Sequence, residues 1–74
     1  MPRYFFDVHD GVDVRDDAGR ELEGPEAARQ EAVRLAAEYA KDVENLSAGG
    51  LLVVTVRDGS GTTVTTVRLI CQID

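Results

Sequence analysis

The fold is decided by one stretch, residues 25–46, which reads PEAARQEAVRLAAEYAKDVENL. Apolar residues recur in it at steps of three and four, which places them on one side of an α-helix. The apolar stripe consists of Ala28, Ala32, Leu35, Ala36, Tyr39, Val43 and Leu46. The opposite side carries charges of both signs, so we expect the stripe to face a sheet. A membrane surface or a peptide groove is the less favoured alternative, because the polar side is not basic.

Both ends of this helix are marked in the sequence. Gly24 followed by Pro25 suits a helix start, because proline is well placed at the first helical position. The run SAGG at residues 47–50 suits a stop, because glycine tolerates the left-handed backbone that ends many helices. The sequence therefore predicts a helix from Pro25 to Leu46, with a strand-forming block on each side.

Length and composition restrict the classes of protein. The 74 residues make a single small domain, residues 1–74, and a chain of this size buries only roughly 60% of its unfolded surface, so oligomerisation is a common remedy. No apolar run approaches the ~20 residues that a membrane span requires, and we expect no signal peptide. The one cysteine, Cys71, excludes an internal disulfide and fits a reducing compartment. We therefore expect a cytoplasmic protein that does not bind membranes.

The net charge is −6 and is unevenly distributed. Seven acidic residues and only two arginines lie between Asp7 and Glu23. A chain without a basic stripe binds nucleic acid poorly, because phosphate neutralisation supplies most of that affinity. An acidic patch remains as a candidate surface for a basic protein or a cation, unless it only keeps a small protein soluble. Its residues are Asp7, Asp10, Asp13, Asp16 and Asp17.

The block before the helix predicts a β-hairpin, because Asp10-Gly11 is a strong turn signal between alternating runs. A three-residue loop at residues 9–11 gathers the apolar side chains on one face, whereas a two-residue loop would mix them with charged ones. The resulting inner face is Tyr4, Phe6, Val8, Val12 and Val14, with Val8 opposite Val12 and Phe6 opposite Val14. Gly11 is then expected in the left-handed conformation, as a bulge. A second turn at residues 16–19 leads to a short extended piece at residues 20–22.

The block after the helix predicts a second hairpin, with its turn at residues 58–61. A four-residue loop pairs Leu52 with Val67, Val54 with Thr65 and Val56 with Thr63. The inner face then continues through Leu69, Cys71 and Ile73. The last strand outruns its hairpin partner in this register, so its end needs another neighbour, either the first strand or a second copy of the protein.

The face of the sheet that turns away from the helix is unusually apolar. One helix covers only one side of a sheet, and an apolar second side marks an interface or a third layer. We expect a homo-oligomer, preferably a dimer, that uses this face, unless strand edges shield its residues or they are scattered singly. The candidate interface residues are Phe5, Leu51, Val53, Val64 and Ile70.

The sequence offers little reactive chemistry. His9, the only histidine, falls in a predicted hairpin tip, which rarely forms a pocket, so we expect it to bond to neighbouring acids. Cys71 is expected to be a small buried hydrophobe. No window fits a calcium-binding loop, and residues 59–61 lack the lysine and the helix that follow a phosphate-binding loop. We therefore expect no enzymatic activity, no metal and no cofactor.

Three segments of the first half carry a resemblance to a known family. The opening PRYFFDVHDG of residues 2–11, DDAGREL of residues 16–22 and EAARQEA of residues 26–32 resemble a family of small bacterial domains of unknown function, frequent in alphaproteobacteria. The resemblance implies a stand-alone cytoplasmic protein and supplies no catalytic residues. Gly24 stands where many relatives have a capping serine or aspartate, so this helix start is weaker than theirs.

A looser resemblance, of layout alone, is to antitoxins of the HicB type. These antitoxins place a strand pair and an alanine-rich helix in the same order and bind a basic toxin, which the acidic patch would suit in sign.

The sequence thus predicts an α+β fold of hairpin, helix and hairpin (ββαββ), with a four-stranded, mostly antiparallel sheet and one helix packed on one face. The expected strand order is 2-1-3-4, and 3-4-1-2 is the alternative. The expected function is that of a small non-enzymatic, self-associating protein-interaction module. The alternative is an antitoxin-like or regulatory partner of a basic protein.

Overall fold

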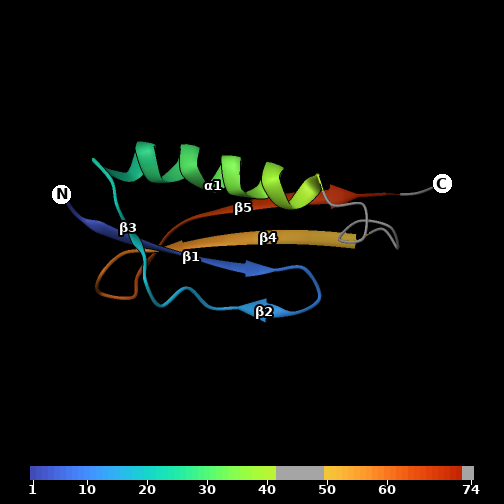
Figure 1. The fold of residues 1–74 in the computed structure, drawn as a ribbon, viewed down its shortest axis with the longest axis horizontal. Coiled ribbons are helices and arrows are strands. Elements are labelled where there is room, and N and C mark those ends of the chain that lie inside the picture. Colours follow the sequence, from blue (N-terminus) through green and yellow to red (C-terminus); the bar gives the residue numbers. More distant parts are fainter. Residues whose placement is uncertain (42–49, 73–74) are drawn as a thin grey trace.

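A computed structural model of the chain describes residues 1–41 and 50–72. One helix lies across one face of an open antiparallel sheet (Figure 1). The elements in chain order are β1 (Arg3–His9), β2 (Asp13–Val14), β3 (Arg20–Glu21), α1 (Pro25–Ala40), β4 (Gly50–Arg57) and β5 (Thr63–Cys71). The strand order is β2-β1-β4-β5, and β3 pairs with β1 as well. The predicted α+β class and the predicted strand order are therefore confirmed, and β3 adds a short fifth strand.

The helix begins where the sequence predicted. Gly24 is the N-cap and Pro25 the first helical residue, so the proline sits where its missing N–H costs nothing. Helix α1 is described to Ala40, with Lys41 as its C-cap. Val43, Leu46 and the predicted stop at residues 47–49 lie outside the described residues.

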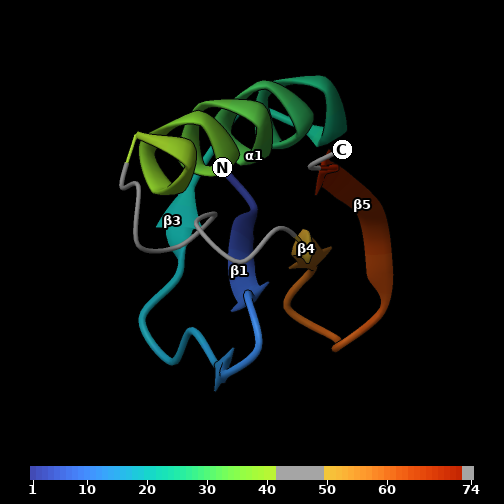
Figure 2. The ribbon, with the colours of Figure 1, turned by 90° about the vertical axis from the view of Figure 1, so that its right-hand side faces the viewer.

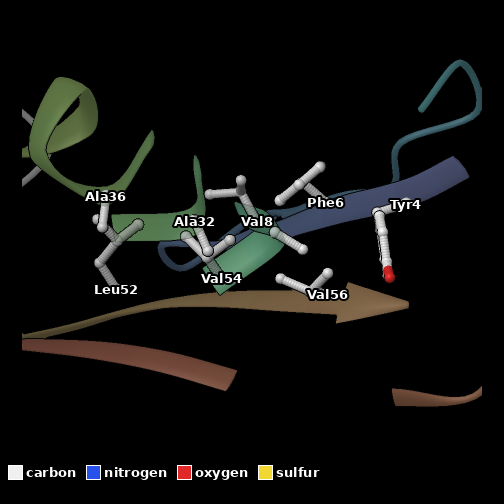
Figure 3. Close-up of a cluster of buried hydrophobic side chains, with 9 residues drawn as sticks. Tyr4, Phe6, Val8, Ala32, Ala36, Leu52, Val54 and Val56 are labelled. Atoms are coloured by element: carbon white, nitrogen blue, oxygen red, sulfur yellow. The ribbon is translucent and has the colours of Figure 1, made fainter. Parts of the chain in front are cut away.

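The core lies between α1 and the two central strands of the sheet. The buried helix residues are all alanines, and they pack on alternate residues of β1 and β4 (Figure 3). Because an alanine side chain is a single methyl group, the helix backbone can approach the sheet closely. The buried core is Tyr4, Phe6, Val8, Ala28, Ala32, Ala36, Leu52, Val54 and Val56.

The first hairpin has a different register from the predicted one. Val8 lies opposite Val14 rather than Val12, and the three-residue loop is formed by residues 10–12 rather than 9–11. A shift of two residues leaves every side chain on its predicted face, because the side-chain period of a strand is two. Gly11 has a positive φ of 100°, as the loop was expected to need.

Two valines that were predicted to line the inner face are exposed. Val12 is 68% exposed and Val14 is 49% exposed. The cause is the position of β2 and of the loop before it, at the end of the strand order and beyond the strands that α1 packs against (Figure 2). A single helix is too narrow to cover all the strands of this sheet, so the outermost one keeps its apolar side chains in solvent.

The second hairpin is also shifted by two residues. Leu52 lies opposite Leu69 and Val54 opposite Val67, with a β-bulge next to Arg57. The loop is longer than predicted because Asp58 organises it. Its carboxylate accepts hydrogen bonds from the N–H groups of Ser60 and Thr62, at 2.9 and 3.0 Å. In this register β5 is paired with β4 as far as Cys71, so the predicted overhang of residues 69–71 is wrong, and Ile73 lies outside the described residues.

Two glycines with positive φ make a matched pair for testing the turns before the helix. An alanine Cβ at Gly19 would lie 2.9 Å from the carbonyl oxygen of Tyr4 and from the ring of Phe5, whereas a Cβ at Gly11 would meet no heavy atom within 4 Å. Both replacements force an L-residue into the left-handed region, at roughly 1–2 kcal/mol. We expect Gly19→Ala to lose about 1–3 kcal/mol more, because of overpacking. Urea denaturation of both variants measures the difference, and equal losses would refute the close packing at Gly19.

Candidate interaction surface

The face of the sheet opposite α1 is the surface to which the sequence pointed. It carries the odd-numbered residues of β1 and β4, because the even-numbered ones are in the core. Its two ends differ in chemistry. One end is held by a polar network around Asp7 and Arg57, and the other end exposes apolar side chains.

Asp7 and Arg57 form the most enclosed ion pair of the described chain. The Nε of Arg57 lies 2.6 Å from Oδ2 of Asp7, and its Nη2 donates to Oδ1 at 3.0 Å. This two-point geometry matches the planar guanidinium to the planar carboxylate. The Arg57 side chain is only 16% exposed and the Asp7 side chain 26% exposed. The pair joins β1 to the end of β4, across 50 residues of sequence.

Asp16 completes the network from the segment between β2 and β3. Its Oδ2 accepts the N–H of Phe6 at 3.0 Å, so a side chain satisfies the backbone of β1 where a strand would otherwise be needed. Its Oδ1 accepts the N–H groups of Ala18 and Gly19, both at 3.0 Å. Its own N–H donates to Oδ1 of Asp7 at 2.9 Å, and its carbonyl oxygen accepts from Nη2 of Arg57 at 3.1 Å.

The network lowers the pKa of both carboxyl groups. The hydrogen bonds from the Arg57 side chain lower the pKa of Asp7, and partial burial opposes them. For Asp16, partial burial raises the pKa, but the N–H donors of Gly19, Phe6 and Ala18 together outweigh it, so the pKa is lowered overall. Both groups are therefore stabilised in their charged form by the folded chain.

The five residues of the acidic patch consequently lie in different settings. Asp7 and Asp16 are half-buried and bonded within the network. Asp13 is exposed and accepts a hydrogen bond from Nδ1 of His9 at 2.6 Å. Asp17 is exposed and Asp10 is half-buried in the hairpin loop. The structure thus separates two internal acids from the acids that a partner could reach.

Two of the candidate interface residues have neighbours within the chain. The guanidinium of Arg57 lies 5.2 Å from the centre of the Phe5 ring, a cation–π contact that covers this half-buried side chain. Val64 stands at the bulge of β5 and packs against the buried core.

The other three candidates form what we call the β4–β5 patch: Leu51, Val53 and Ile70. Leu51 and Ile70 are directly opposite each other on neighbouring strands and are 45% and 71% exposed. Val53 is half-buried between His9 and Arg68, its partners on either side. The patch lies at the end of the sheet where β4 begins and β5 ends.

A groove between α1 and β5 was not anticipated from the sequence. It is lined by apolar residues of the second half of the helix and of the last strand, with two cations at its rim: Val33, Ala36, Ala37, Ala40, Lys41, Val67, Arg68 and Leu69. The sequence did contain a signal for this groove. Val33, Ala37 and Ala40 are spaced by four and three residues, so they form a second apolar row on the helix beside the main stripe.

The two residues considered for catalysis are both placed differently from expectation, because His9 was expected in a hairpin loop and Cys71 in the buried core. His9 is the last residue of β1 rather than part of the hairpin loop, and it is exposed. It borders an open groove with Asp7, Asp13 and Thr55. Cys71 is half-buried at the end of β5, opposite Gly50.

Two kinds of feature are absent from residues 1–41 and 50–72. In these segments no group of three or more histidine, cysteine, aspartate or glutamate side chains could hold a metal ion. No helix in the same segments has the length and apolarity to cross a membrane.

The fold and this surface define a small α+β domain with one helix-covered and one open sheet face. The sequence model of a family described as a domain of unknown function, DUF6894, matches residues 3–70. The chain belongs to this family. No curated protein and no solved structure matches it.

The network around Asp16 predicts a specific sensitivity to acid. A carboxyl group whose pKa is lowered by folding adds stability that is present above its unfolded pKa and is lost as the pH falls through the folded pKa. We expect Asp16→Asn to lose about 1–3 kcal/mol at pH 7, because an amide cannot accept all three N–H donors, and to show a flatter decline of stability below pH 5. Urea denaturation from pH 7 to pH 2 measures both effects.

Asp17→Asn is the matched control for this experiment, because it removes the same charge one residue away on an exposed side chain. Its free energy of unfolding is expected to stay within about 0.5 kcal/mol of the wild type. Equal losses in the two variants would show that net charge, rather than the bonded carboxylate of Asp16, sets the acid sensitivity.

Proposed function

We propose that this protein is a small, non-enzymatic interaction module that associates with a second copy of itself. The observation that carries the proposal is the pairing of Leu51 and Ile70, two large apolar side chains that face each other across neighbouring strands and point away from the helix. Full burial of such a side chain contributes roughly 1.5–3 kcal/mol, and neither of the two is fully buried in the described chain.

The size of the domain supports self-association. The buried core of the described residues contains nine side chains, and three of them are alanines. A core of this size leaves a small margin of stability, which burial of further apolar surface between copies would increase.

The placement of the titratable side chains supports a non-enzymatic role. In the described part of the chain several of them pair with one another, as Asp7 does with Arg57 and His9 with Asp13. A catalytic site needs such groups to converge on a recess that can hold a substrate. The groove beside His9 is open, and its acids already bond to neighbours within the chain.

Self-association predicts a concentration-dependent dimer that one substitution weakens. We expect light scattering coupled to gel filtration to give the mass of two chains at high concentration. Ile70→Lys should raise the dimer dissociation constant at least about tenfold, because an ammonium group would have to lose its hydration at the contact.

Val12→Lys is the control, because Val12 has nearly the same exposed fraction as Ile70 but lies in the loop before β2. It should leave the dimer unchanged, and circular dichroism would verify that both variants fold. A strictly monomeric wild type at millimolar concentration would refute the proposal.

A second candidate function is supported by the exposed acids. Asp13, Asp17, Glu21 and Glu23 are exposed along β2, β3 and their connections, on the first part of the chain. This surface has the charge to bind a basic protein, as an antitoxin-like or regulatory partner would.

This second candidate predicts that neutralising two exposed acids releases a basic partner. Asp17→Asn/Glu23→Gln should lose a protein that wild type retains in a native pull-down, and the retention should fall with salt. Glu26→Gln/Glu38→Gln changes the net charge equally on the outer side of α1, where both acids are exposed, and should retain it. Equal retention by the two double variants would exclude the acidic surface as the binding site.

A further inference from the structure

We propose that the two copies meet along β5, edge to edge and antiparallel, about a two-fold axis at Val67. The inference deepens the proposed self-association and rests on it. It assigns the contact to the open edge of the sheet, so that the two sheets become one continuous sheet with both helices on the same side.

The exposed edge of β5 is built as a pairing surface. The strand is the last in the sheet order, and it spans nine residues that include neither proline nor glycine and only one charge, Arg68 (Figure 2). Natural sheets protect their open edges with prolines, charges, bulges or short strands. β5 has a bulge only at its start, opposite Arg57. Seven residues beyond that point are left as a regular template.

The opposite edge of the sheet is closed. There β1 is paired at one end with β2 and at the other end with β3, and the Asp16 side chain bonds to the backbone of Phe6 between them. β2 and β3 are two residues long each. β5 therefore offers a second copy an extended row of strand backbone groups. The edge formed by β2 and β3 offers no row of similar length.

The charge distribution favours the same approach. The acids between Asp7 and Glu23 lie on the side of β2 and β3, whereas β4, β5 and their loop contain Arg57, Arg68 and Asp58 as their charged residues. Two chains of net charge −6 repel each other, and this repulsion is weakest when the acidic edges are farthest apart. A β5–β5 contact places the acidic edges at the two outer ends of the joint sheet.

The sequence of β5 is self-complementary in one register. An axis at Val67 lies within the regular part of the strand and pairs Thr65–Leu69 with the same five residues of the second copy. In this register Arg68 lies opposite Thr66 of the second copy, whereas an axis one residue later would place the two Arg68 side chains against each other. Thr65 lies opposite Leu69 of the second copy on the helix-covered face, so a small side chain meets a large one there.

The groove between α1 and β5 fits this axis. Val67 and Leu69 line its floor and Val33 its helix side, and they lie next to the position of the axis. In the joint sheet the grooves of the two copies face each other across it. The apolar rows of the two helices, which include the exposed Val33, then approach each other above the paired strands.

A disulfide tests the register directly. In the proposed dimer position 67 lies opposite position 67 of the second copy, at a separation that a disulfide can bridge. Within one chain position 67 is four residues from Cys71 on the same strand, roughly 13 Å, which no disulfide spans. We expect Val67→Cys to give a covalent dimer on a non-reducing gel after mild oxidation. Leu69→Cys is on the same face of the strand, but its counterpart in the second copy lies four residues further along, so it should remain a monomer on the gel.

Two substitutions of opposite charge separate this contact from other modes of dimerisation. Thr66→Glu places a carboxylate opposite Arg68 of the second copy and should tighten the dimer roughly three- to tenfold, and Thr66→Arg should weaken it by a similar factor. Analytical ultracentrifugation measures both, with circular dichroism as the folding control.

The outcomes distinguish pairing along β5 from self-association through another surface. A tighter dimer for Thr66→Glu and a weaker one for Thr66→Arg, together with the Val67→Cys cross-link, support pairing along β5. If both charges weaken a wild-type dimer, or if both cysteine variants cross-link equally, the contact is elsewhere and the β5 axis is refuted while self-association stands. A monomeric wild type refutes both.

Discussion

The side chain of Asp16 and the Asp7–Arg57 ion pair are the constraint on which the first third of the chain depends. β1 is a central strand, yet the strands on its outer side are only two residues long each. The carboxylate of Asp16 bonds to the backbone of β1 between them, and Arg57 holds the carbonyl oxygen of Asp16 from the end of β4. An unpaired N–H in the middle of a half-buried strand is costly. The carboxylate of Asp16 accepts the hydrogen bond that a neighbouring strand would otherwise accept.

The parts of the fold that periodicity controls were predictable, and the parts that single side chains control were not. The helix start at Pro25, the faces of the strands and the strand order follow from spacing and from antiparallel connection. Both hairpin registers were wrong by two residues, because such a shift leaves the alternation of apolar and polar residues unchanged. The carboxylates of Asp58 and Asp16 decide the registers through bonds to loop and strand N–H groups. Alternation carries no information about such bonds.

The contrast between periodicity and single side chains also explains which parts of the interaction surface could be predicted. Alternation assigned Phe5, Leu51 and Val53 to the open face, but it does not reveal which of them is covered by another side chain. Phe5 has one because Arg57, fixed by Asp7, lies over its ring. Leu51 has no such contact, since it lies near the start of β4, two residues before Val53, which pairs with the end of β1. The groove beside Val33 depends on how far α1 lies from β5, a distance that no local pattern encodes.

The polar network also explains why the two edges of the sheet differ. Closing the β1 edge by side chains requires acids in the segment between β2 and β3, since a carboxylate can accept several N–H bonds at once. Acidic residues accordingly lie near this edge, whereas the hairpin of β4 and β5 is nearly neutral. An edge strand with one charge has little to repel a second strand, whereas the acidic edge repels its own copy. The same interactions that complete the fold at one edge therefore leave β5 as the open edge of the sheet, with a single charge in the strand.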